Sequence, residues 1–264
     1  MQILTRNEAT DRAAHLHVSA IDVVVDIRGA QDTTIPTYPV TSTLTMTSDE
    51  ERTFIDIVGD VTEVLLNGVP HPFEDDEDRV WVGGLPVGET ITLEVHALAR
   101  YSRSGEGLHR YTDPEDGEVY LYTQFEPNDA HRAWPCIDQP DVKPEWTFHV
   151  IAPAGWVVSS NGIETGVESV DETGALRHDF TATRPLSSYI TAIVAGPWAV
   201  IEGGTWSGGA SDGGHAELAL RLLCRRTLAR YLDADDVFEV TRAGLDFYHA
   251  RYGVTFPWGS YDQV

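Results

Sequence analysis

Gln124 and Glu126 are the side chains whose types and spacing best suit ligand binding. They stand two positions apart after a run of aromatic and β-branched residues, so on a β-strand both would point to the same side. Phe125 would then face a core, and Pro127 would end the strand. A carboxylate beside an amide, next to a loop, can hold a polar ligand group. From residue types alone, solvated surface or an internal hydrogen bond is the simpler interpretation of this pair.

The sequence lacks the familiar motifs of hydrolytic and phosphate-binding sites. Zinc hydrolases place two histidines four residues apart on a helix, with a glutamate between them. His249, on the clearest predicted helix, has no such partner, and His15 and His17 are more simply solvated surface. There is no Gly-x-Ser-x-Gly elbow and no phosphate loop. We therefore predict no catalytic residue and no metal ligand in this chain.

A cysteine and two aspartates follow the Gln124–Glu126 pair. We predict that Cys136 is a buried structural cysteine, because no neighbour other than His131 could activate its thiol. Asp138 and Asp141 are predicted to cap turns around Pro140 rather than to bind a metal.

Composition narrows the possible partners. The 264 residues carry 18 basic and 42 acidic side chains, a net charge of −24. Such a balance argues against nucleic acid and anionic membranes as partners, because both would repel the protein. The first 14 residues lack the apolar stretch of an export signal, and no segment approaches the roughly 20 apolar residues of a membrane span. Two widely separated cysteines form no disulfide framework, so a cytoplasmic location is predicted.

Most of the chain alternates apolar and polar residues with the period of a β-strand. Val23, Val25 and Ile27 are examples, and turn signals such as Asn67-Gly68 and Asn161-Gly162 separate the strands. The pattern predicts a mainly β, antiparallel domain.

The pattern changes near residue 203. We predict an all-β domain over 1–202, a glycine-rich linker over 203–216, and a second segment over 217–264. The second segment contains the clearest helix, with Asp233 as its N-cap and Gly253 at its end.

The segment from Thr123 to Asp141 resembles the signature of the N-terminal domain of M1-family zinc aminopeptidases, of the aminopeptidase N type. Further resemblance covers most of the chain. It extends to Glu106–Arg110, typical of the actinobacterial branch, and to Tyr189–Pro197 and Phe247–Val264. His131 and Trp134 depart from the commonest residues of the family, which are arginine and phenylalanine.

The resemblance implies a saddle-shaped, sandwich-like antiparallel β domain, followed by the first strands and helix of a thermolysin-like α/β catalytic domain. It implies that Glu126 binds the free α-ammonium of a peptide substrate and that Gln124 lines the pocket for the first side chain. The family's Gly-x-Met-Glu-Asn and His-Glu-x-x-His motifs do not occur in these residues. We therefore expect zinc in the full-length enzyme but no zinc ligand here, and no activity from this chain without the missing catalytic domain.

Three interpretations follow from the resemblance. The chain could be the front portion of an aminopeptidase, a non-catalytic module that binds peptides or proteins, or half of a split enzyme. The first is favoured, because residues 217–264 resemble the entry to a catalytic domain and would add little to a binding module.

Overall fold

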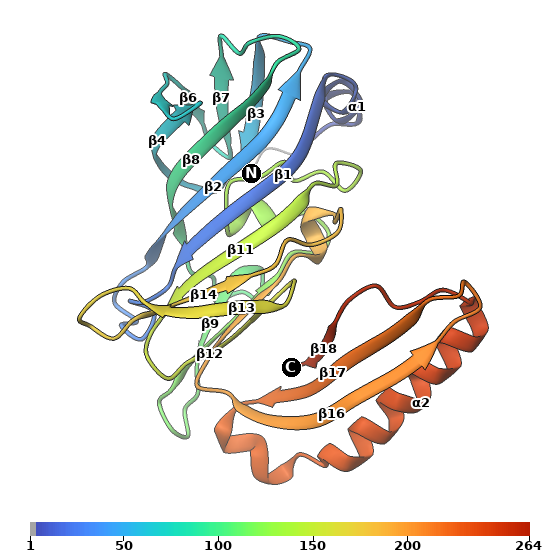
Figure 1. Ribbon diagram of the computed structural model, residues 1–264. Helices are drawn as coiled ribbons and strands as arrows, with labels where there is room; N and C mark the ends of the chain where they lie inside the picture. Colours follow the sequence, from blue (N-terminus) through green and yellow to red (C-terminus); the bar gives the residue numbers. More distant parts are fainter. Residues whose placement is uncertain (1–3) are drawn as a thin grey trace. The chain divides into compact units, whose positions relative to one another are not determined.

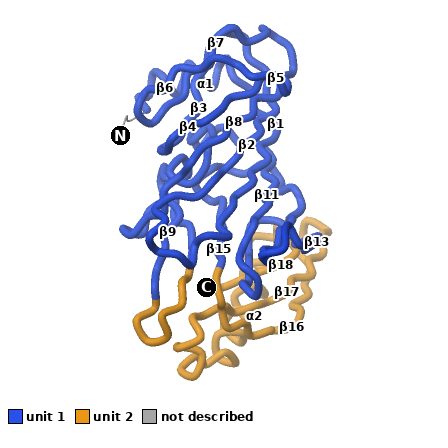
Figure 2. The backbone as a smooth tube through the Cα atoms, turned by 90° about the vertical axis from the view of Figure 1, so that its left-hand side faces the viewer, with its two compact units in different colours: residues 1–112, 121–195 blue, residues 113–120, 196–264 orange. Residues whose placement is uncertain are grey.

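The computed structural model describes residues 4–264. They form two compact units (Figure 2). The first unit contains the residues up to Thr112 together with Leu121–Ala195, and the second contains Asp113–Tyr120 and Gly196–Val264. None of the helices in the described residues is long and apolar enough to cross a membrane.

The largest sheet of the first unit has eight strands. Its order is β13 (Glu164–Ser169), β14 (Leu176–Phe180), β11 (Glu145–Ala152), β1 (Leu16–Asp26), β2 (Thr37–Ser48), β8 (Thr90–Arg100), β4 (Gly59–Leu66) and β5 (Val69–Pro70). Figure 1 shows its strands from β13 to β4 side by side, and Figure 2 labels β5. All described pairings in this sheet are antiparallel except β1 with β11. The predicted mainly β fold is confirmed.

Alternation along these strands creates the core. Val23 and Val25 of β1 and Leu44 of β2 are fully buried, whereas Thr43 and Thr45 point to the opposite, partly solvated face. Two smaller sheets complete the unit: β3 (Arg52–Asp56), β7 (Arg79–Gly83) and β6 (Glu74–Asp76) form one, and β12 (Val157–Ser160), β15 (Ile193–Gly196), β10 (Val119–Gln124) and β9 (Gly107–Thr112) form the other.

Helix α1 (Arg6–His15) begins with a capping box. The Thr5 hydroxyl accepts a hydrogen bond from the Glu8 N–H at 3.3 Å, and the Glu8 carboxylate accepts one from the Thr5 N–H at 2.8 Å. The reciprocal bonds satisfy two backbone donors that would otherwise lack partners at the start of the helix. The Thr5 hydroxyl also donates a hydrogen bond to the Glu8 carboxylate at 2.6 Å. This bond is the largest cause that lowers the pKa of Glu8 to about 2, followed by the bond from Arg79 and the one from the Thr5 N–H.

The second unit is a three-stranded sheet with one long helix. Strands β16 (Ala199–Gly209) and β17 (His215–Cys224) are antiparallel, and β18 (Ser260–Gln263) runs parallel to β17. Helix α2 (Ala234–Tyr252) lies along this sheet (Figure 1). As predicted, the Asp233 side chain caps its N-terminus and Gly253 ends it in the left-handed conformation, with φ of 67°.

The residues predicted as a glycine-rich linker, 203–216, lie largely within the β16–β17 pair. The prediction of a flexible linker is therefore wrong for these positions. Their glycines serve close packing: a Cβ atom on Gly203 would lie 2.3 Å from the Phe238 ring, and one on Gly208 would lie 2.4 Å from the Trp206 ring. Glycine is needed here because no side chain fits beneath those aromatic groups.

Candidate functional site

Gln124 is the last residue of β10, a strand that lies between β9 and β15. The Thr123 hydroxyl accepts a hydrogen bond from the Ile193 N–H at 2.9 Å, which ties the end of β10 to β15. Phe125 follows and is buried edge-to-face against Trp134, with 4.9 Å between ring centroids. Gln124 itself is exposed.

Glu126 lies in the turn after β10 rather than on the strand. The expectation that Gln124 and Glu126 share one strand face is therefore wrong, because the chain turns at Phe125, whose carbonyl accepts a bond from the Asp129 N–H at 2.9 Å. The Glu126 side chain is exposed, and within residues 4–264 no hydrogen bond or ion pair engages its carboxylate. It is thus free to accept a ligand's donors.

The second half of the Thr123–Asp141 segment forms a buried polar network that the sequence patterns did not indicate. Its centre is Arg12 of α1, whose side chain is only 3% exposed. Arg12 donates one hydrogen bond to the Asp56 carboxylate at 2.8 Å and another to the Gln139 side chain at 3.0 Å. Gln139 in turn donates to the Ala9 carbonyl at 2.8 Å. These bonds fasten α1 to β3 and to the Thr123–Asp141 segment.

Asp138 extends this network. Its N–H donates to the Asp56 carboxylate at 2.9 Å, and its own carboxylate accepts bonds from His131 Nδ1 at 2.7 Å and Ser188 Oγ at 2.6 Å. The prediction that the Asp138 side chain caps a turn at Pro140 is wrong, because that side chain is buried and bridges η1 (Ala130–Arg132) and η2 (Ser188–Ile190).

His131 is buried within this network and carries a raised pKa. Burial by itself lowers the pKa, but the hydrogen bond to Asp138 and the negative charges of Asp138, Asp56 and Asp78 outweigh it. The acidic side chains around His131 therefore favour the protonated form of its imidazole. This half of the segment maintains the fold, whereas Gln124 and Glu126 are exposed.

Cys136 is fully buried, as predicted. Its backbone exchanges two hydrogen bonds with Asp56, at 2.9 and 3.0 Å. Burial raises the pKa of its thiol well above the usual value, and burial also raises that of the half-buried Cys224. A thiol of this kind is not a nucleophile at neutral pH.

We expect a thiol reagent such as Ellman's reagent to label one cysteine of the native chain and two of the denatured chain. Labelling of Cys136 should be at least about a hundredfold slower than that of Cys224, because it requires local opening. Cys224→Ser should abolish the fast phase. A fast phase that survives in Cys224→Ser would show that Cys136 is accessible.

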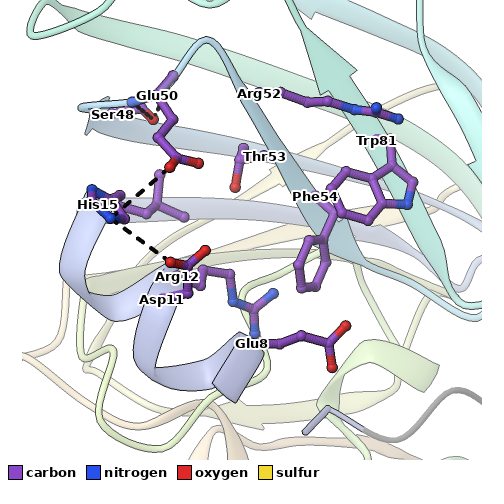
Figure 3. A pocket seen from close by; sticks show the side chains of 11 residues that line it. Glu8, Asp11, Arg12, His15, Ser48, Glu50, Arg52, Thr53, Phe54 and Trp81 are labelled. Carbon is purple, nitrogen blue, oxygen red and sulfur yellow. Dashed lines mark hydrogen bonds and ion pairs between the residues drawn. The ribbon is translucent and has the colours of Figure 1, made fainter. Parts of the chain in front are cut away.

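A small cavity of about 120 Å³ lies between α1, the end of β2, β3 and β7. Figure 3 shows His15 at its rim, with Asp11 and Glu50 on either side of the imidazole. Nε2 of His15 lies 3.9 Å from an Asp11 oxygen and 4.0 Å from a Glu50 oxygen.

The cationic groups around this cavity are already partnered. Arg12 lies over the Phe54 ring, 4.3 Å from its centroid, and Arg52 lies over the Trp81 ring, 4.7 Å from its centroid. Arg12 pairs with the Asp56 carboxylate at 2.8 Å, and Arg52 pairs with the Glu74 carboxylate at 2.7 Å. Because both arginines already have carboxylate partners, we interpret this cavity as part of the contact between α1 and the sheet rather than as a ligand site.

Zinc, which the sequence resemblance implies for a longer enzyme, does not fit the side chains seen here. The part of the chain that the structure describes contains no group of three or more histidine, cysteine, aspartate or glutamate side chains able to hold a metal ion. An exposed amide and an exposed carboxylate, such as those of Gln124 and Glu126, can form hydrogen bonds with a cationic or polar ligand group.

Comparison with known proteins shows a clear family resemblance. Residues 75–190, which include Gln124, Glu126 and most of the buried network, match the peptidase M1 N-terminal domain. The chain is similar to the N-terminal portion of M1-family aminopeptidases.

Three relatives illustrate the match. Aminopeptidase N of Streptomyces lividans is 38% identical over 266 residues, which is 99% of this chain and 29% of that protein. Aminopeptidase N of Haemonchus contortus is 32% identical over 52% of this chain and 14% of its own length. The probable M1 family aminopeptidase 1 of Encephalitozoon cuniculi is 37% identical over 44% of this chain and 13% of its own length. The chain thus spans less than a third of each of these curated relatives.

Proposed function

We propose that this chain is the substrate-anchoring part of a zinc aminopeptidase that removes N-terminal residues from peptides. The observation that carries the proposal is the 38% identity to an aminopeptidase N along 99% of the chain. The exposed carboxylate of Glu126, which has no partner among residues 4–264, supports it. In this proposal, zinc and the cleavage of the peptide bond would belong to the rest of the enzyme. We also propose that the enzyme is located in the cytoplasm.

In this role the Glu126 carboxylate accepts hydrogen bonds from the α-ammonium of the peptide, and Gln124 lies against the first side chain. An aminopeptidase must cleave the peptide bond that follows the first residue. A carboxylate in a fixed position selects this bond by binding the α-ammonium of the peptide. Charge-assisted bonds of this kind are short and strong relative to neutral ones. Holding the ammonium also fixes where the first carbonyl lies, and such positioning lowers the barrier to reaction.

The test uses the purified chain and two tripeptides that differ only in N-terminal acetylation. We expect the free-amine peptide to bind weakly, with Kd in the millimolar range, and to shift backbone NMR signals of residues 122–129. The acetylated peptide should produce no such shifts. We also expect no stoichiometric zinc and no turnover of amino-acid arylamides by this chain alone. Equal shifts with both peptides would contradict amine recognition, and turnover with bound zinc would contradict the assignment of chemistry to the rest of the enzyme.

A further inference from the structure

A cationic cavity lies in the first unit, in a chain whose net charge is −24. Its volume is about 310 Å³, roughly ten times the share of one liquid water molecule. It is lined by Thr33, Arg103, His109, Arg110, Tyr111 and Thr112. None of these lining residues is acidic, although acidic residues outnumber basic ones by 42 to 18 in the whole sequence.

Arg110 of β9 is the buried cation of this cavity, with 6% of the residue exposed. Its guanidinium donates to the backbone carbonyls of Asp32, Thr33 and Ile35 at 2.9–3.3 Å and lies 4.2 Å from the centroid of the Tyr101 ring. These partners orient the guanidinium but are all uncharged.

Among the residues that the structure describes, no side-chain carboxylate forms a direct bond with Arg110. Asp32 attracts it at longer range, but the Asp32 carboxylate accepts bonds from the N–H and hydroxyl of Thr34 at 2.9 and 2.6 Å. Burial lowers the pKa of Arg110, and repulsion by Arg103 lowers it further, against the attraction of Tyr101 and Asp32. The side chain stays charged, because guanidinium groups do not lose their proton in proteins. Two like charges therefore face one cavity.

Arg103 and His109 supply free donors. Arg103 is exposed, and it forms no hydrogen bond or ion pair with any residue in the described range. His109 Nδ1 accepts a bond from the Gly105 N–H at 3.1 Å, and burial lowers the pKa of the ring. A neutral imidazole that accepts at Nδ1 carries its proton on Nε2. The Tyr122 ring, 4.9 Å away between centroids, holds the imidazole in place.

We propose that this cavity binds a small oxyanion of the phosphate type. The anion would accept hydrogen bonds from Arg103 and from His109 Nε2, and it would neutralise the repulsion between Arg103 and Arg110. Thr33 and Thr112 line the same cavity, and threonine hydroxyl groups can donate further hydrogen bonds to a tetrahedral anion. Planar, multiply donating guanidinium groups are well suited to phosphate oxygens. The site is independent of the proposed role of Glu126.

Binding is tested by titrating inorganic phosphate into the full 264-residue chain at constant ionic strength, with chloride and acetate as alternative anions. We expect saturable binding of one phosphate, weaker binding of acetate, and no saturable binding of chloride. Because charge-assisted hydrogen bonds are lost, Arg103→Gln should weaken phosphate binding at least about tenfold.

Arg184→Gln is the matched control, since Arg184 is also exposed and forms no ion pair with described residues but does not line the cavity. It should leave phosphate affinity unchanged. Phosphate should also raise the pKa of His109, measured by NMR, in the native chain but not in Arg103→Gln. Equal affinities in the two variants, or an unmoved His109 pKa at saturation, would overturn the proposal. Both substitutions are at exposed positions, so thermal unfolding should confirm that each variant remains folded.

Discussion

Replacing Asp56 by alanine should lower the free energy of unfolding by about 3–5 kcal/mol, because it leaves a buried arginine without its counter-charge. The Arg12 side chain is 3% exposed and the Asp56 side chain 11% exposed, so water cannot take over the lost interaction. The same substitution removes the acceptor of the Asp138 N–H. The measurement is urea unfolding followed by tryptophan fluorescence, with the loss expected in the transition of the first unit.

Asp60→Ala provides the matched control. Asp60 also pairs with an arginine, Arg100, at 3.2 Å, but the two side chains are 64% and 58% exposed. Exposed pairs contribute about 0–1 kcal/mol, so this variant should differ little from the parent.

The double variant Arg12→Met with Asp56→Ala should recover part of the stability lost in Asp56→Ala, because no uncompensated charge remains buried. If Asp56→Ala and Asp60→Ala lower the free energy of unfolding by the same amount, the buried network around Arg12 stabilises the fold no more than an exposed ion pair does.

The regular elements of this chain could be predicted because they depend on local patterns. Apolar residues at every second position over most of β1 and β2 indicate strands whichever partners they have. Asp233 and Gly253 mark the ends of α2 through capping preferences that act within a few residues. These signals need no knowledge of the tertiary structure.

The buried network could not be predicted from spacing. Arg12 is separated by 44 residues from Asp56 and by 127 from Gln139, and nothing in their local sequence connects them. The linker was mispredicted for a related reason: glycines at positions 203–209 resemble a flexible segment unless the Phe238 and Trp206 rings that cover them are known. The Arg12 network and the Gly203–Phe238 contact both join segments that are distant in sequence.

Glu126 could be singled out from sequence only through the family resemblance. Its neighbours place it in an exposed turn, where a free glutamate is usually solvated surface. The structure adds that the carboxylate has no partner among the described residues, while Phe125 beside it is buried and fixes the start of the turn. The proposed role of this carboxylate is to anchor a substrate, which requires the catalytic part of the proposed enzyme. Kinetics measured on a form that includes that part are therefore the sharpest test of this role.

In a form of the protein extended to include the catalytic domain, Glu126→Gln should lower kcat/KM for amino-acid arylamides at least about tenfold. A hydrogen bond to a charged group contributes about 1.5–3 kcal/mol, and each 1.4 kcal/mol corresponds to a factor of ten. Glutamine retains the size and one acceptor oxygen but loses the negative charge, so the substitution isolates the attraction to the α-ammonium.

Glu172→Gln is the control for Glu126→Gln, because Glu172 is likewise an exposed glutamate in a turn. It should leave kcat/KM unchanged, and both variants should unfold within about 0.5 kcal/mol of the parent. The division of the effect between KM and kcat then reports what the anchor does. A rise in KM alone would mean that Glu126 holds the substrate equally in the ground and transition states, whereas a fall in kcat as well would mean that it also positions the scissile carbonyl. Unchanged kcat/KM in Glu126→Gln would remove Glu126 from the substrate site altogether.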